Sequence, residues 1–336
     1  MNRFLIAAVG CCMASSAVSQ EVLNLYSSRH YDTDERLYSD FEEETGIKIN
    51  RIEGNADELI ARMLAEGANS PADILLTVDT SRLERARNEG LFQSIQSDTL
   101  EARIPENLQD ENNQWFGFSQ RARIFFYDSD EIQDPPQSYA DLADPRFEGR
   151  VCSRSGTNVY SQTLLASLVA NLGEEAAREW AAGVVNNFAR DPQGGDTDQL
   201  RAIVSGECDI AISNTYYFAR AIRTDVSGLS DEDLASIGWV FPDQGSFGAH
   251  MNISGGGVAT HAPNRDNAVR FLEYLTSRQA QEYFSAGNDE YPAVAGVALS
   301  PSVEALGEFQ PDAIDLSDVA EQVGTATRIF NEVGWE

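Results

Sequence analysis

Short apolar runs alternate with amphipathic segments along the first hundred residues. Strands are predicted at 21–26, 47–52 and 74–78, and helices at 34–45, 56–66 and 81–88. The run at 74–78 has no polar alternation, which is typical of a parallel strand covered on both faces. This order of elements predicts an α/β fold, with βαβ units around a doubly wound sheet.

Two later runs are long enough to connect separate parts of a protein. Residues 115–127 form an extended run that exceeds the usual strand length of about 5–6 residues. A second extended run at 252–259 contains Gly255, Gly256 and Gly257, and no Lys-Ser/Thr pair follows them, so they predict close backbone packing and not a phosphate loop. Two such crossings predict two lobes around a hinged central cleft.

The remaining pattern completes the second lobe. Further strands are predicted at 150–153, 208–213 and 238–242, and further helices at 157–172, 174–185, 197–204, 264–283 and 316–333. We expect an N-terminal lobe of residues 20–121 and 247–297, and a C-terminal lobe of residues 122–246 and 298–336. In such sheets, ligands bind beyond the carboxyl ends of the strands.

Composition narrows the range of partners. The chain has 336 residues, which is too long for one small core, and a formal net charge of −30 with 54 acidic against 24 basic side chains. A surface this acidic repels nucleic acids and anionic membranes, so both are excluded as partners. It attracts cations, although composition alone defines no cation site.

The first 19 residues have the pattern of a secretory signal. Arg3 supplies the positive start, an apolar core follows, and Ala17-Val18-Ser19 offers small residues for cleavage. A lipoprotein signal with Cys11 as the anchored residue is the alternative. No later stretch reaches the roughly 20 apolar residues of a membrane span. We therefore expect a protein of the periplasm.

Two cysteines remain after the signal, Cys152 and Cys208. An even pair in an oxidising compartment favours a disulfide between them. Two buried free thiols are the alternative that the sequence leaves open.

The most informative chemistry lies at Asn214-Thr215-Tyr216-Tyr217. This stretch follows an apolar strand and precedes a helix, so a strand-to-helix turn can direct both tyrosine hydroxyls into one cleft. Phenolate is a hard anionic ligand that suits Fe(III), and a trivalent ion alongside lowers the pKa of a phenol. The alternative is that the two rings only pack a helix against the sheet.

Three other residues occupy comparable positions. His30 and Tyr31 follow the first predicted strand, and Tyr160 lies in the first turn of a predicted helix. Together with Tyr216 and Tyr217 they form a reasonable ligand set for Fe(III). Taken singly, each has an ordinary structural interpretation, as a capping histidine, a rim aromatic or a helix packing residue.

Several charged or imidazole side chains are secondary candidates. Arginines that follow or precede the tyrosines either offset phenolate charge or form ordinary salt bridges; they are Arg29, Arg121 and Arg220. Asp79, which follows a buried strand, is a candidate carboxylate of the N-terminal lobe, but the preferred interpretation is a helix cap before Ser81. The two remaining histidines have no ligand-type neighbours at metal spacing and are interpreted as structural; they are His250 and His261.

These residues resemble those of the periplasmic ferric-ion-binding proteins of iron ABC transporters, in the branch that binds Fe(III) through tyrosines without an accompanying anion. The similar segments are Tyr26–Tyr31, Glu53-Gly54, Pro71–Asp73, Arg121–Arg123, Asn214–Tyr217, Asn252–Gly255 and Glu290–Pro292. The resemblance implies the two-lobed fold and the metal ligands His30, Tyr31, Tyr160, Tyr216 and Tyr217. Tyr139 is the rival to Tyr160 and is interpreted as a structural turn residue. No residue is identified for the sixth coordination position.

The resemblance implies a monomeric, non-enzymatic carrier that binds Fe(III) and delivers it to a membrane permease of an ABC transporter. The alternative is a carrier of the same fold for an organic or oxyanion solute. An exported hydrolase is disfavoured, because the chain contains no Gly-x-Ser-x-Gly, His-Glu-x-x-His or P-loop motif.

Overall fold

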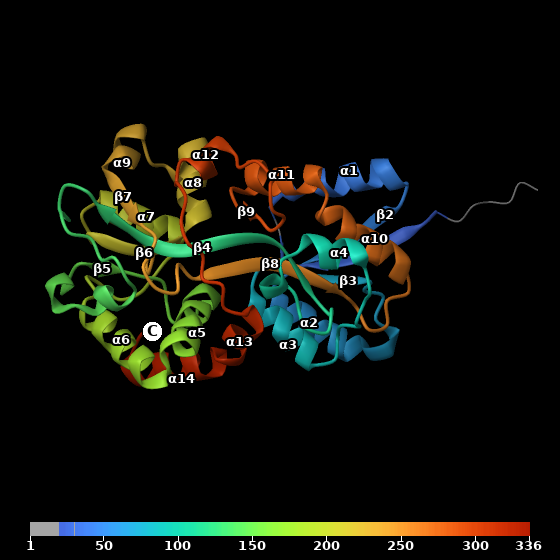
Figure 1. Cartoon of the computed structure of the whole chain (residues 1–336), viewed down its shortest axis with the longest axis horizontal. Helices are drawn as coiled ribbons and strands as arrows, with labels where there is room; N and C mark the ends of the chain where they lie inside the picture. The colour runs from blue at the N-terminus through green and yellow to red at the C-terminus, as the bar shows by residue number, and fades with distance from the viewer. Residues whose placement is uncertain (1–19, 30) are drawn as a thin grey trace, which may run out of the picture.

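Two strands, β4 (Phe116–Asp128) and β8 (Met251–Val258), run side by side across the middle of the protein and connect its two lobes (Figure 1). The structure is a computed structural model and describes residues 20–29 and 31–336. The predicted signal at 1–19 and the predicted ligand His30 lie outside the described residues. The architecture is the mixed α/β, two-lobed one that the sequence predicts.

The remaining strands are β1 (Val22–Ser27), β2 (Lys48–Glu53), β3 (Ile74–Thr77), β5 (Val151–Cys152), β6 (Ile210–Asn214), β7 (Ile237–Val240) and β9 (Tyr291–Pro292). The α-helices are α1 (Glu35–Thr45), α2 (Ala56–Glu66), α3 (Thr80–Asn88), α4 (Asp98–Arg103), α5 (Val159–Leu172), α6 (Glu174–Asn186), α7 (Asp196–Val204), α8 (Thr215–Arg223), α9 (Asp231–Ser236), α10 (Arg265–Leu275), α11 (Arg278–Asn288), α12 (Pro301–Glu304), α13 (Leu316–Glu321) and α14 (Val323–Val333). Short 3-10 helices cover Asp32–Asp34, Gly67–Asn69, Glu106–Leu108, Ala140–Ala143, Pro145–Phe147 and Asp225–Ser227.

The sheet continues through both lobes in the order β2-β1-β3-β8-β4-β6-β5, with β7 and β9 also paired to β4. Strands β1, β2 and β3 are parallel to one another, and β8 is antiparallel to β3. The first part of β4 pairs with β8, and its last five residues before Asp128 pair with β6. Strand β4 therefore begins in one lobe and ends in the other, as its length predicts.

The three glycines of β8 permit close approach of neighbouring segments. A Cβ atom on Gly256 would lie 2.3 Å from Leu76 Cδ2, and one on Gly257 would lie 2.2 Å from the carbonyl oxygen of Gln114. No side chain fits at these distances, which is the close packing that the sequence predicts for this stretch.

Separate hydrophobic cores stabilise the two lobes. In the N-terminal lobe, β1–β3 pack against α1, α2 and α10, and Leu25 and Phe271 are fully buried. In the C-terminal lobe, Leu165 and Ile329 lie in a core on one face of the sheet, and Phe218 lies in a second core that includes the disulfide. The exact residue boundaries proposed for the lobes stay a prediction.

Two helices that the sequence predicts as continuous are interrupted. The segment 264–283 forms α10 and α11, because Ser277 caps a new helix by accepting a hydrogen bond from the backbone nitrogen of Ala280 at 3.2 Å. The segment 316–333 forms α13, which packs on α3, and α14, which packs on α5 and α6. In both cases the apolar periodicity continues across a break that capping and packing impose.

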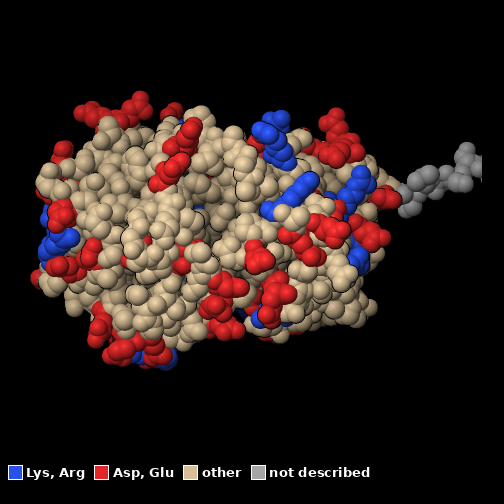
Figure 2. Space-filling model, viewed as in Figure 1, with Lys and Arg blue, Asp and Glu red and all other residues tan. Residues whose placement is uncertain are grey.

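Acidic side chains dominate the visible charge on the face in Figure 2, where red Asp and Glu groups far outnumber the blue Lys and Arg groups. In residues 20–29 and 31–336, no helix combines the length and the apolar character needed to span a membrane.

Candidate metal site

The turn after β6 places Tyr216 and Tyr217 together. Strand β6 is buried along its whole length, Asn214 keeps extended backbone angles, and α8 begins at the next residue. The two consecutive tyrosine rings then lie with their centres 4.2 Å apart, tilted by 30°. In a continuing strand they would face opposite sides of the sheet, so the turn into the helix is what brings them together.

A second segment brings Tyr160 to the same place. Asn158 caps α5 by accepting a hydrogen bond from the backbone nitrogen of Tyr160 at 3.0 Å, which fixes the first turn of the helix. The hydroxyl of Tyr216 donates to the hydroxyl of Tyr160 across 3.4 Å. Three tyrosines of the C-terminal lobe therefore lie in one cluster.

The N-terminal lobe contributes Tyr31, which follows β1. The guanidinium carbon of Arg29 lies 5.1 Å from the centre of its ring, and that of Arg220, which belongs to α8 of the other lobe, lies 5.6 Å away. Tyr31 also interacts electrostatically with Tyr160 and Tyr216. The structure thus brings together the four tyrosines that the sequence singles out, from both lobes.

Buried positive charge lies beside these phenols. Arg121 is almost fully buried, donates to the hydroxyl of Ser254 at 2.9 Å, and lies 3.5 Å from a carboxylate oxygen of Glu290. Its guanidinium carbon is 5.7 Å from the centre of the Tyr160 ring. Within the described residues its Nε and Nη2 atoms have no hydrogen-bond partner. This arginine can offset negative charge that develops on the tyrosines.

Burial favours the protonated form of three of these phenols, those of Tyr31, Tyr216 and Tyr217. Burial raises the pKa of Tyr31 and of Tyr216 well above the ordinary phenol range. Burial and the neighbouring Asp196 carboxylate raise the pKa of Tyr217 to about 12. A bound cation must therefore displace protons, so the cluster favours an ion whose charge is high enough to do this.

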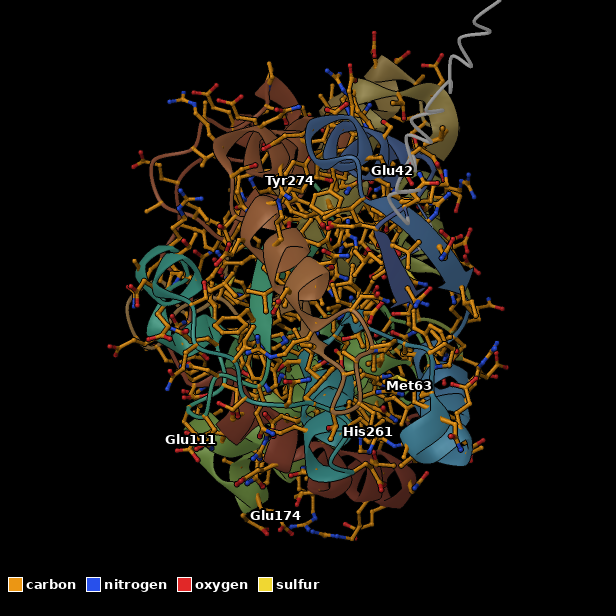
Figure 3. The ribbon with its side chains drawn as sticks, turned by 90° about the vertical axis from the view of Figure 1, so that its right-hand side faces the viewer. Glu42, Met63, Glu111, Glu174, His261 and Tyr274 are labelled. Carbon is orange, nitrogen blue, oxygen red and sulfur yellow. A yellow bond between two sulfur atoms is a disulfide. The ribbon has the colours of Figure 1, made fainter. Side chains whose placement is uncertain are left out.

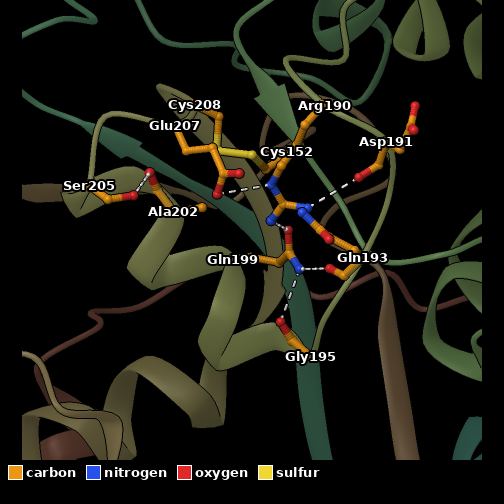
Figure 4. Close-up of a disulfide and its surroundings, with 10 residues drawn as sticks. All are labelled: Cys152, Arg190, Asp191, Gln193, Gly195, Gln199, Ala202, Ser205, Glu207 and Cys208. Carbon is orange, nitrogen blue, oxygen red and sulfur yellow. Dashed lines mark hydrogen bonds and ion pairs between the residues drawn. A yellow bond between two sulfur atoms is a disulfide. The ribbon is translucent and has the colours of Figure 1, made fainter.

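A disulfide links the two chain segments that precede the C-terminal tyrosines (Figure 4). Cys152 at the end of β5 is bonded to Cys208 just before β6, which confirms the predicted pairing. The first segment continues to Tyr160 and the second to Tyr216 and Tyr217. The bond therefore holds together the two segments that carry the C-terminal tyrosines.

The other candidates from the sequence have structural contacts. Asp79 caps α3 by accepting a hydrogen bond from the backbone nitrogen of Ser81 at 2.9 Å, as predicted. The hydroxyl of Tyr139 donates to the carbonyl of Arg123 at 2.6 Å and accepts from the backbone nitrogen of His250 at 3.0 Å. Tyr139 thus points into the C-terminal core and away from Tyr216.

Neither described histidine joins the tyrosines. His250 is buried, and burial lowers its pKa to about 3, so its imidazole stays neutral. His261 is exposed and lies near Met63 (Figure 3). Both residues line a groove of about 180 Å³. Among the described residues, no group of three or more His, Cys, Asp and Glu side chains is placed to hold a metal ion. A metal at this cleft would depend on the phenols.

The chain matches the family model described as "Bacterial extracellular solute-binding protein" over residues 69–309. This chain belongs to that family.

Relatives of known name agree with this assignment. The solute-binding protein is 48% identical over 325 residues to "Iron uptake protein A1" of Synechocystis sp., a match that covers 96% of this chain and 90% of the relative. A solved structure of a Trichodesmium protein in complex with iron and citrate ligands has a TM-score of 0.89 and 46% identity, and covers 94% of this chain and 100% of that chain. The ferric binding protein from Campylobacter jejuni has a TM-score of 0.86 and 40% identity, with coverage of 94% and 100%.

A cavity of about 500 Å³ in this solute-binding protein reaches the start of α5, the helix that carries Tyr160. Its lining includes Ser28, the first residue after β1, and Val159, the neighbour of Tyr160. Three carboxylates and one arginine also line it; these are Glu53, Asp57, Asp79 and Arg82. Carboxylates therefore outnumber the arginine among the charged residues that line this cavity.

Sequence reasoning missed one part of the site, a network of buried charges that involves Arg123, Arg154 and Asp196. Arg123 is nearly fully buried on β4, and Asp196 is fully buried at the start of α7. The available signal was the Arg-Ala-Arg stretch at 121–123, since two arginines on one face of an otherwise apolar strand demand buried partners. Which acids supply those partners depends on packing between distant segments.

Proposed function

We propose that this solute-binding protein binds ferric iron in the cleft between its lobes and delivers it to the membrane permease of an ABC transporter. The proposed ligands are His30, Tyr31, Tyr160, Tyr216 and Tyr217. The observation that carries the proposal is the convergence of four tyrosines from three segments, with the Tyr216 and Tyr160 hydroxyl oxygens 3.4 Å apart.

The chemistry of the cluster supports Fe(III) over softer or less charged ions. Phenolate oxygens are hard anionic donors, and three of them balance a charge of 3+. Divalent ions carry less charge with which to displace protons from buried phenols. Arg121 and Arg220, which lie over the rings of Tyr160 and Tyr216, offset the charge of a fourth phenolate.

The names of several relatives support the same assignment, since these are an iron uptake protein, an Fe(3+)-binding periplasmic protein and a major ferric iron-binding protein. We further propose that residues 1–19 direct export, that the mature chain works as a monomer in the periplasm, and that it is a carrier without catalytic activity. The description of the family as extracellular solute-binding proteins supports this location.

Titration of the purified protein with Fe(III) tests the proposal. Phenolate-to-iron charge transfer should produce an orange to red colour that saturates at one ion per chain, and Zn(II) at the same concentration should give none. Tyr274→Phe is a matched control, because this buried hydroxyl has no hydrogen-bond partner in the described structure and lies outside the cluster. A wild-type protein that stays colourless with excess Fe(III) would refute the assignment.

The alternative function is that of a carrier for an organic or oxyanion solute. The cavity of about 500 Å³ has room for a small organic molecule, so this alternative has to be tested. Its carboxylates disfavour an anion. Calorimetry with organic acids and polyamines, in the absence of iron, should detect no binding if the cavity serves iron alone.

A further inference from the structure

A buried carboxylate joins the two segments that carry the C-terminal tyrosines. Asp196, at the start of α7, is fully buried. One of its oxygens accepts from Nη1 of Arg123 at 2.8 Å, and the other accepts from Nη1 of Arg154 at 2.7 Å. The carboxylate is thus shared between two guanidinium groups that come from different strands and loops.

Arg154 connects Asp196 to Tyr160. It lies in the loop between β5 and α5, and its guanidinium carbon is 5.6 Å from the centre of the Tyr160 ring. The carbonyl of Arg154 also accepts a hydrogen bond from the indole of Trp335 at 2.9 Å, which holds the backbone of this loop. Asp196 holds the side chain of Arg154 in place beside the Tyr160 ring.

Arg123 connects Asp196 to the turn that precedes Tyr216 and Tyr217. The same Nη1 atom that contacts Asp196 donates to the side-chain oxygen of Asn214 at 3.0 Å. Asn214 is the residue before α8, yet its side chain makes no capping hydrogen bond to the helix. The side-chain oxygen of Asn214 accepts from Arg123 instead. The turn that directs the two tyrosines into the cleft is therefore connected to Asp196 through Arg123.

We propose that Asp196 is a positioning residue of the metal site, which sets the relative placement of Tyr160 and of the Tyr216-Tyr217 pair without contacting the metal. This inference rests on the proposed function. Loss of the carboxylate charge leaves the buried Arg123 guanidinium and the partly exposed Arg154 guanidinium without their shared counter-ion, and their repulsion moves one or both away. The Arg154 group over Tyr160 and the Arg123 group at Asn214 then shift, and the phenol oxygens no longer converge.

The variant Asp196→Asn tests this role, because it keeps the side-chain shape and removes the charge. The matched control is Asp209→Asn, which removes the carboxylate partner of Arg150 at the opposite, amino end of β6. Ferric affinity is measured by competition with a chelator, together with the wavelength of the visible band and the melting temperature without iron. We expect Asp196→Asn to lose about 10–100-fold in ferric affinity, the range for residues that orient metal ligands, and to shift the band.

Asp209→Asn should keep the wild-type affinity and band, even where its melting temperature falls. A band and affinity that Asp196→Asn leaves unchanged, or a loss of affinity that follows the melting temperature alone with no band shift, would overturn the inference. If Asp196→Asn does not fold, the partly exposed Arg154→Gln removes one arm of the network and should shift the band in the same way. Wild-type protein that takes up no iron would refute the proposed function itself, whereas iron uptake by wild type and both network variants with identical spectra would refute only the role of Asp196.

Discussion

The two lobes hold their tyrosines in different ways. In the C-terminal lobe, Tyr160, Tyr216 and Tyr217 lie on two helix starts that are joined by the disulfide and by the Asp196 network. In the N-terminal lobe, Tyr31 lies on the segment after β1, and the arginines over its ring come from its own lobe and from α8 across the cleft. The C-terminal lobe presents three donors on segments that are linked to each other, and the N-terminal lobe adds donors from a single segment.

This difference indicates an order of events. The C-terminal tyrosines are held together by contacts within their own lobe, so three of the five proposed ligands are in place before closure. The placement of Tyr31 next to them depends on contacts between lobes, such as Thr163 donating to Asp79 at 3.0 Å and Arg223 donating to Asp289 at 2.8 Å. We infer that the C-terminal lobe captures the ion and that closure adds His30 and Tyr31.

The largest expected effect is that of pH. Burial keeps the free phenols protonated, so each phenolate that binds iron releases a proton and affinity falls as the pH falls. With three to four phenolates, each pH unit should lower the affinity about 10³–10⁴-fold, and Tyr31→Phe should reduce this slope by about one proton. Chelator competition between pH 8 and 5 measures it. Retention of colour down to about pH 4 would indicate a carboxylate site instead.

Removal of a C-terminal donor should have the next largest effect. Tyr216→Phe and Tyr217→Phe each keep the ring packing and delete one anionic ligand. We expect ferric affinity to fall more than about 100-fold, beyond the loss typical of residues that only orient ligands, and the visible colour to fade. Iron titration, with Tyr274→Phe as the control, measures it. Wild-type affinity in both variants would contradict the ligand assignment.

Removal of the N-terminal donor should cost less. Tyr31→Phe leaves intact the three C-terminal tyrosines, which contacts within their own lobe already hold together and which balance a charge of 3+. We therefore expect a loss of about 10–100-fold with the colour retained at a shifted wavelength. Small-angle scattering should show less complete closure when iron is added. A loss as large as that of Tyr216→Phe would contradict the proposed order, because the two lobes would then contribute equally.

The disulfide should affect stability more than ferric affinity. Replacement of Cys152 and Cys208 by serine opens a loop of 56 residues, and the entropy of such a loop corresponds to about 4 kcal/mol of unfolding free energy. Urea denaturation without iron measures this loss. Ferric affinity should change least among the variants considered, because the Asp196 network still joins the two segments. An affinity loss greater than that of Asp196→Asn would show that the disulfide, and not the Asp196 network, is the main link that positions the two tyrosine-bearing segments.

The sequence by itself determined the local structure around the tyrosines. The apolar run of β6 followed by polar residues fixes a strand and then a turn, so the placement of Tyr216 and Tyr217 at a helix start follows from short-range pattern. The length of β4 and the glycines of β8 likewise predict the two crossings. These features depend on residues that are close to each other in the chain, so the apolar periodicity and the turn residues are sufficient to predict them.

Tertiary structure alone decided which distant side chains meet. The sequence left Tyr139 as a rival to Tyr160, and only packing turns the Tyr139 hydroxyl into the core and the Tyr160 hydroxyl toward Tyr216. The partnership of Asp196 with Arg123 and Arg154 joins residues 42 and 73 positions apart. In a chain with 54 acidic residues, sequence offers each arginine many candidate partners, and burial in a shared core selects one.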